Sequence, residues 1–232
     1  MPILREIILD TETTGLSPKN GDRIIEIGCV EMIDKRLTGR YFHHYVNPER
    51  DIPFGATKVH GITNAQVADK PLFRHVANEF LEFIKDGTLV IHNAPFDTGF
   101  LNHELERASL SNLRRIKVVD TVMMARKKFP GSPANLDALC RRYGVNLDRR
   151  DKHGALLDAN LLAEVYVHLC GGPQAVMFAD PSAVKNAPSL KAEKKPRLMP
   201  LEGGRRSLPP TEEEERLHAD FLKKIKDPLW TA

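Results

Sequence analysis

Short apolar runs alternate with longer amphipathic stretches through most of the chain, and Pro, Gly, Asn and Asp separate them. The apolar runs predict strands near Ile7 to Asp10, Ile24 to Ile33, Arg40 to Val46, Thr88 to His92 and Lys117 to Asp120. The amphipathic stretches predict helices near Leu72 to Lys85, Phe96 to Ala108, Thr121 to Lys128, Leu136 to Tyr143 and Gly154 to Leu169. Because the strands come first and then alternate with helices, we expect an α/β fold with a mixed sheet flanked by helices.

The pattern changes after residue 172, so we expect a domain over 1–172 followed by two other segments. Prolines spread among Lys, Ala, Ser and Gly predict an extended, solvated linker over 173–210. Over 211–232, Thr211 is placed to cap a helix whose first turn holds four glutamates, Glu212 to Glu215. So short a helix cannot bury its own apolar stripe, which predicts docking on a partner, with a frayed tail as the alternative. The apolar positions are Leu217, Phe221, Leu222 and Ile225, followed by Leu229 and Trp230.

Composition narrows the class of protein. Hydrophobic residues make up 41% of the 232 positions, which indicates a globular chain and not an intrinsically disordered one. The longest apolar runs are too short for a membrane span or a signal-peptide core, so we expect a cytoplasmic protein with no membrane partner. Cys29, Cys140 and Cys170 are widely spaced and form no CxxC pair, and we expect buried, reduced thiols.

The net charge of +3 is unevenly distributed. Lys185 to Arg206 holds seven basic and two acidic residues, so the rest of the chain is slightly acidic. A domain without basic excess is not expected to grip a long polyanion by counterion release, so its hold on nucleic acid should be local. The basic segment itself is interpreted as a solvated linker.

Asp10 and Glu12 end the first apolar run, in the sequence IILDTETTG. Strand side chains alternate, so the two carboxylates would project from one face. Two ionised carboxylates at close quarters either raise a pKa or bind a hard cation such as Mg²⁺ or Mn²⁺. The alternative for this motif alone is a strand that runs out into a polar turn.

Two further motifs add acidic residues. Asp97 closes HNAPFD, after an apolar run, and Asp158 closes HGALLD, five residues after His153 and at the start of a segment apolar nearly all round. Because burying an unpaired carboxylate is costly, Asp158 implies protonation, a salt bridge or a metal. The plainer alternatives are that Asp97 caps a helix, Asp158 sits in a favourable first turn, and His153 is a loop histidine.

Together these residues, in the order D-x-E, D, H-x4-D, resemble the DEDDh group of 3′-to-5′ exonucleases. The motifs DTETTG, HNAPFD, HGALLD and VHGIT are similar in sequence to those of the epsilon proofreading subunits of bacterial DNA polymerase III. The similarity covers about Ile3 to Phe178. The resemblance implies a ribonuclease-H-like five-stranded sheet. It also implies a 3′-5′ exodeoxyribonuclease of the polymerase III holoenzyme that edits the 3′ end of single-stranded or mispaired primer DNA.

The resemblance further implies a role for each of the five residues. Asp10 would bridge two divalent ions, Glu12 and Asp158 would complete the nucleophile-side site, and Asp97 would support the other ion through water. His153 would be the general base, because an imidazole titrates near neutral pH.

Other positions are expected to contact substrate beside Asp10, Glu12 and Asp158. Thr13, Thr14 and Gly15 would bring backbone donors to the terminal nucleotide, since Gly permits close approach. His60 of VHGIT matches a family position beside the substrate. Asn93 and Phe96 would shape the pocket, the ring offering a face for stacking. For these positions a structural turn, loop or core role is the alternative.

The segment Gln174 to Phe178, QAVMF, resembles the Q-x-x-[LM]-F peptide with which bacterial replication proteins hold the β sliding clamp. Gln174, Met177 and Phe178 are the expected clamp contacts, unless Met177 and Phe178 pack back on the domain. In the family, the C-terminal segment binds the polymerase α subunit.

Two other classes of protein compete with this interpretation. A free-standing DEDDh exonuclease acting on RNA or short oligonucleotides would share the five residues, but the linker and terminal helix argue against it. A non-catalytic adaptor between clamp and polymerase is disfavoured because all five catalytic positions are intact.

Overall fold

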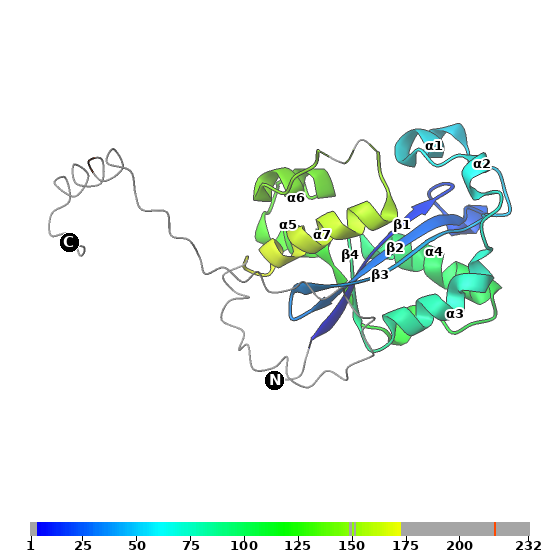
Figure 1. Ribbon diagram of the computed structural model, residues 1–232, viewed down its shortest axis with the longest axis horizontal. Coiled ribbons are helices and arrows are strands. Elements are labelled where there is room, and N and C mark those ends of the chain that lie inside the picture. Colours follow the sequence, from blue (N-terminus) through cyan, green and yellow to red (C-terminus); the bar gives the residue numbers. More distant parts are fainter. Residues whose placement is uncertain (1–3, 149, 151, 173–215, 217–232) are drawn as a thin grey trace, which may run out of the picture. The chain divides into compact units, whose positions relative to one another are not determined.

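A mixed five-stranded sheet, in the order β3-β2-β1-β4-β5, forms the centre of the domain (Figure 1). Strands β1 (Arg5–Thr13), β2 (Ile24–Ile33) and β3 (Arg36–Tyr45) are antiparallel neighbours. Strands β4 (Thr88–Ile91) and β5 (Val118–Asp120) run parallel to β1. The ribonuclease-H-like sheet implied by the resemblance is confirmed.

The computed structural model describes residues 4–148, 150, 152–172 and 216. The expected linker, the clamp peptide and nearly all of the C-terminal segment lie outside the described residues. Arg216 of that segment is helical. Within the described part of the chain, no helix combines the length and the apolar character that crossing a membrane requires.

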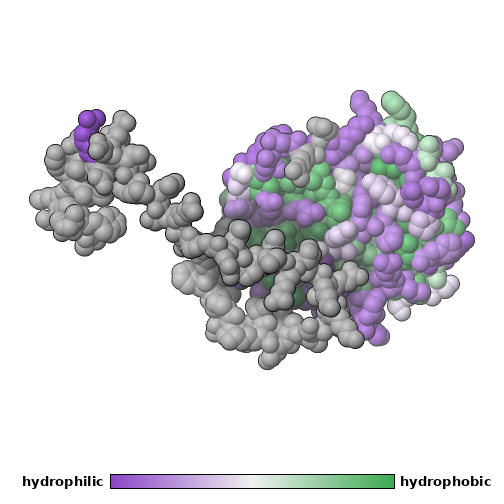
Figure 2. Space-filling view, in the orientation of Figure 1, coloured by the Kyte–Doolittle hydropathy of each residue, from purple (hydrophilic) through white to green (hydrophobic). Residues whose placement is uncertain are grey.

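Helices pack on both faces of the sheet (Figure 1). On one face, α3 (Phe73–Ile84) and α4 (Ala94–Arg107) place Phe80 and Phe100 against Ile7 and Leu9 of β1. On the other, α7 (Ala155–Leu169) places Leu162 against Ile8, with α5 (Thr121–Lys128) and α6 (Leu136–Tyr143) beside it. Figure 2 shows hydrophilic residues over most of the visible surface, with hydrophobic ones concentrated over α6 and α7. Because Ile7 and Leu9 pack with α3 and α4, and Ile8 packs with α7, odd-numbered positions of β1 face α3 and α4 and even-numbered positions face α7.

Short helices complete the domain. The helix α1 (Phe54–His60) ends at Gly61, whose φ of 77° is left-handed, and α2 (Asn64–Val67) follows. Two 3₁₀ turns span Pro18–Asn20 and Leu113–Arg115. The sequence pattern did not predict α1, because its large apolar side chains Phe54 and Val59 are exposed and form no core-facing stripe.

Two sequence-based predictions are corrected here. Strand β1 does not end at Asp10 but continues to Thr13, with Glu12 paired opposite Glu26 of β2, so the polar-turn alternative is wrong. Cys29 and Cys140 are buried free thiols as predicted, but Cys170 is exposed because it caps the C-terminal end of α7 at the surface.

Candidate active site

Four acidic side chains from three elements converge beside the end of β1. Asp10 and Glu12 lie on its α7-facing side, Asp97 is in the first turn of α4, and Asp158 is in the first turn of α7. Asp10, His153 and Asp158 line one pocket of about 210 Å³. Oxygens of Glu12 and Asp158 and a ring nitrogen of His153 lie within 4.8 Å of one another. The structure thus brings together the residues of the three sequence motifs.

Burial and mutual repulsion make these carboxyls hard to ionise. Burial, followed by the charges of Asp97, Glu12 and Asp158, raises the pKa of Asp10 well above its ordinary value. Burial and the charge of Asp158 raise the pKa of Glu12 to about 8. Burial raises the pKa of Asp97 to about 7, although hydrogen bonds oppose the shift. A divalent cation would reverse these shifts, and clustered carboxylate oxygens are the ligands that Mg²⁺ and Mn²⁺ prefer, so the residues present fit the expected ions.

Asp97 is fixed by a residue that the sequence did not single out. Thr11 faces α4, and its Oγ1 donates to Oδ1 of Asp97 at 2.7 Å. The cap of α4 is Asn93, in a left-handed conformation with φ of 67°, so Asp97 is a first-turn residue and the cap alternative is wrong. The threonine between Asp10 and Glu12 was the available signal, because alternation sends it to the opposite face.

Arg150 also belongs to the site and was missed. Its Nε and Nη2 each donate at 2.6 Å to one oxygen of Asp158, and Nη2 also lies 2.9 Å from Nδ1 of His153. Nη1 donates to Asp137. Of the three states that burial implied for Asp158, the structure shows the salt bridge. The sequence offered no signal beyond a basic stretch before His153.

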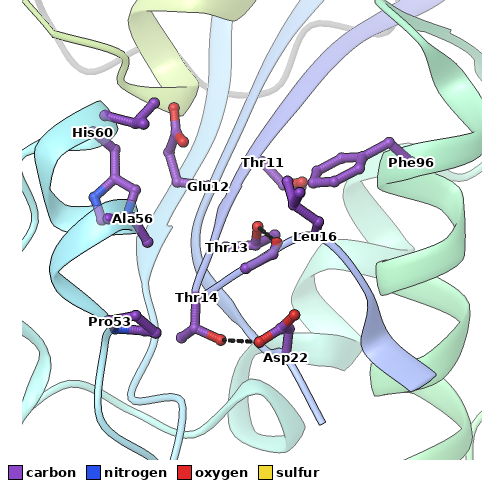
Figure 3. A pocket seen from close by; sticks show the side chains of 13 residues that line it. Thr11, Glu12, Thr13, Thr14, Leu16, Asp22, Pro53, Ala56, His60 and Phe96 are labelled. Atoms are coloured by element: carbon purple, nitrogen blue, oxygen red, sulfur yellow. Dashed lines mark hydrogen bonds between the residues drawn. The ribbon is translucent and has the colours of Figure 1, made fainter. Parts of the chain in front are cut away.

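A second pocket, of about 500 Å³, opens on the other side of Glu12 (Figure 3). The end of β1 and the turn after it form its floor, α1 forms one wall with Ala56 and His60, and Phe96 of α4 stands opposite. Five of the expected substrate contacts line this pocket: Thr13, Thr14, Gly15, His60 and Phe96. The pocket is also lined by residues that the sequence did not reveal: Leu16, Asp22, Pro53, Gly55 and Val59.

Two expected contacts behave differently. Asn93 is exposed and lines neither of these pockets, because its backbone serves to begin α4. The close approach that requires Gly15 is made by Asp22, whose carboxylate would lie 2.4 Å from an added Cβ. Thr14 Oγ1 donates to the same carboxylate at 3.5 Å, so this turn is held from within the protein.

His60 offers a donor to the larger pocket. Its Nδ1 accepts a hydrogen bond from the backbone N–H of Ile62 at 3.0 Å, so the ring proton sits on Nε2. Nε2 is buried and has no partner among the described residues. Burial lowers the pKa of His60, which keeps the ring neutral. The side chain can therefore donate one hydrogen bond to a ligand oxygen.

Glu26 and Gly28 of β2 position the start of α7. Oε2 of Glu26 accepts a hydrogen bond from the backbone N–H of Ala155 at 3.1 Å, and Oε1 lies 2.7 Å from Nε2 of His43. A carboxylate at a helix N-terminus is favourable. Gly28 lies opposite Asp10, where α7 crosses the sheet, and a Cβ there would be 2.3 Å from the backbone of Ala155. This contact brings Asp158 close to Asp10.

Comparison with known proteins agrees with this geometry. Residues 7–166 match the family model described as Exonuclease. The DNA polymerase III subunit epsilon of Rickettsia conorii is 52% identical over 230 residues, covering 97% of this chain and 98% of that protein. The protein of the same name from Buchnera aphidicola is 44% identical, covering 96% and 95%.

Solved structures share the fold. Exonuclease X in complex with 5′ overhanging duplex DNA is 30% identical with a TM-score of 0.55, covering 72% of this chain and 90% of that one. The nuclease domain of 3′hExo, a DEDDh family member bound to rAMP, has a TM-score of 0.64 at 22% identity, covering 73% and 92%. At that identity the second likeness concerns the fold alone.

Proposed function

This chain belongs to the epsilon-subunit family of DNA polymerase III and is a proofreading 3′-to-5′ exonuclease, and on that premise we propose that Asp10, Glu12, Asp97 and Asp158 hold two divalent ions, Mg²⁺ or Mn²⁺. The observation that carries the proposal is the convergence of these acidic groups in one buried cluster. Bound ions would supply Lewis-acid stabilisation of the charge that develops on the phosphodiester.

The protein's own groups then have distinct tasks. His153, with Nδ1 3.3 Å from Oδ2 of Asp158 and a side chain 47% exposed, accepts the proton of the attacking water. The larger pocket receives the terminal nucleotide, where Phe96 offers a stacking face and His60 a hydrogen-bond donor. The proposed substrate is the 3′ end of single-stranded or mispaired primer DNA.

The metal site is tested on a primer with a mispaired 3′ end. We expect the chain to release single nucleotides in Mg²⁺ or Mn²⁺ and to stop when EDTA is added. Asp97→Asn should lower the rate by roughly 100-fold or more, because metal stabilisation is worth several kcal/mol. Asp86→Asn, the same change at an exposed turn, should leave the rate unaltered.

Activity that persists in EDTA would refute the metal proposal. A preference for an RNA oligonucleotide over the mispaired DNA would instead favour the alternative function, a free-standing exonuclease.

We further propose three parts with separate tasks: the exonuclease domain over 1–172, a linker over 173–210, and a polymerase-binding segment over 211–232. The sequence and the family support this division, because Gln174, Met177 and Phe178 match a clamp peptide and the terminal stripe suits docking on the α subunit. An enzyme with these partners works in the cytoplasm.

Two triple-alanine variants test the partners. Alanine at Gln174, Met177 and Phe178 should abolish co-elution with the β clamp in gel filtration while binding to α persists. Alanine at Phe221, Leu222 and Ile225 should have the converse effect, so each variant is the other's control. Unchanged co-elution with the clamp in the first variant would refute the clamp assignment, and unchanged binding to α in the second would refute the docking assignment.

A further inference from the structure

We propose that Arg150 is a positioning residue that competes with a divalent ion for Asp158 and so sets the affinity of the site for that ion. The inference rests on the proposed metal site. In the arrangement that the structure shows, the guanidinium holds Asp158 and His153 together in a resting state, and it must release both before the site can work.

The first step is the occupancy of Asp158. Arg150 donates to both carboxylate oxygens through Nε and Nη2, each at 2.6 Å. Their side chains are only 7% and 4% exposed. A bidentate Arg–carboxylate pair is among the strongest polar contacts, and here it engages both oxygens that Asp158 could offer as ligands. Metal ligation by Asp158 therefore requires that at least one of these bonds break.

The second step concerns His153. An arginine has no acceptor, so Nη2 donates to Nδ1 of His153 across the 2.9 Å between them. With Nδ1 accepting that bond, the proton of the neutral ring is on Nε2. Neither nitrogen then has a free lone pair for the proton of a water molecule. Release of Arg150 would free Asp158 as a ligand and His153 as a base in one movement.

The third step is where the guanidinium goes. Its Nη1 is bonded to Asp137 of α6, whose side chain is 42% exposed at the rim of the same pocket. Arg150 can thus leave Asp158 and keep a partly solvated carboxylate as its partner, which avoids a buried unpaired charge. A divalent ion carries twice the charge of the guanidinium, so the exchange favours the ion in this acidic site.

The test measures Mn²⁺ affinity by calorimetry on the full chain, without substrate. Arg150→Lys keeps the positive charge but removes the guanidinium that makes two hydrogen bonds to Asp158, whereas Arg150→Gln removes both the charge and the guanidinium. We expect both variants to bind Mn²⁺ at least about fivefold more tightly than wild type, a change of about 1 kcal/mol. Arg141→Gln, the same charge removal at an exposed position of α6, is the matched control and should change the affinity by less than about twofold.

The outcomes are distinguishable. Tighter binding in Arg150→Gln alone would show a simple charge effect and overturn the competition, as would unchanged or weaker binding in Arg150→Lys. If the Arg150 variants fail to fold in thermal melts, the wild-type chain decides: competition predicts that saturating Mg²⁺ speeds the exchange of the Arg150 Nε–H proton with water in NMR spectra, because its bond to Asp158 breaks, whereas unchanged or slower exchange would overturn the proposal. A wild-type chain that does not bind Mn²⁺ would refute the metal site itself.

Discussion

His153→Ala is expected to lower the rate of nucleotide release by roughly 10²–10⁴-fold, the usual contribution of a general base. His153 lies beside Asp158 with a half-exposed side chain and lines the acidic pocket but not the larger pocket. Removing the ring therefore removes a proton acceptor and leaves the nucleotide-binding walls in place. Single-turnover kinetics on a mispaired primer should show the loss in the rate constant, with KM nearly unchanged.

Two measurements separate this role from a structural one. His75→Ala makes the same chemical change at an exposed position of α3 and should retain the wild-type rate. In His153→Ala the deficit should shrink as pH rises, because solvent hydroxide can replace the missing base. Wild-type turnover in His153→Ala, or a loss confined to KM, would show that the base is another group.

The acidic residues could be found from the sequence because their placement is local. Alternation along β1 puts Asp10 and Glu12 on one face. The apolar run before Asp97 and the apolar segment that Asp158 opens indicate where α4 and α7 begin. The same local signals located the five strands and the five longer helices, with errors mainly at their ends.

Residues whose roles depend on tertiary contacts could not be found. Arg150 and Glu26 are ordinary charged residues in the sequence, and their partners Asp158 and Ala155 become evident only when β2, α7 and the preceding loop meet. The wall of the larger pocket was missed for a related reason. The helix α1 has its large apolar side chains Phe54 and Val59 at the surface, so its sequence lacks the hydrophobic periodicity that would predict a helix.

Gly28→Ala is expected to have the largest effect on stability. The new Cβ would lie 2.3 Å from the backbone carbonyl carbon of Ala155 and from the backbone nitrogen of Leu156, and backbone cannot rotate away as a side chain can. The start of α7 must shift or the strand must bend. We expect a loss of about 3 kcal/mol in the free energy of unfolding, which lowers Tm by roughly 6–12 °C for a domain of this size.

Gly99→Ala is the matched control, because Gly99 lies inside α4 and a Cβ there would meet no other atom within 4 Å. Alanine is the better helix former, so this variant should gain about 0.5–1 kcal/mol. Gly28→Ala should also lose exonuclease activity at temperatures where it is still folded, because a shift of α7 moves Asp158 away from Asp10. A variant that melts like wild type and keeps its rate would show that the close crossing of α7 over β2 does not hold the site together.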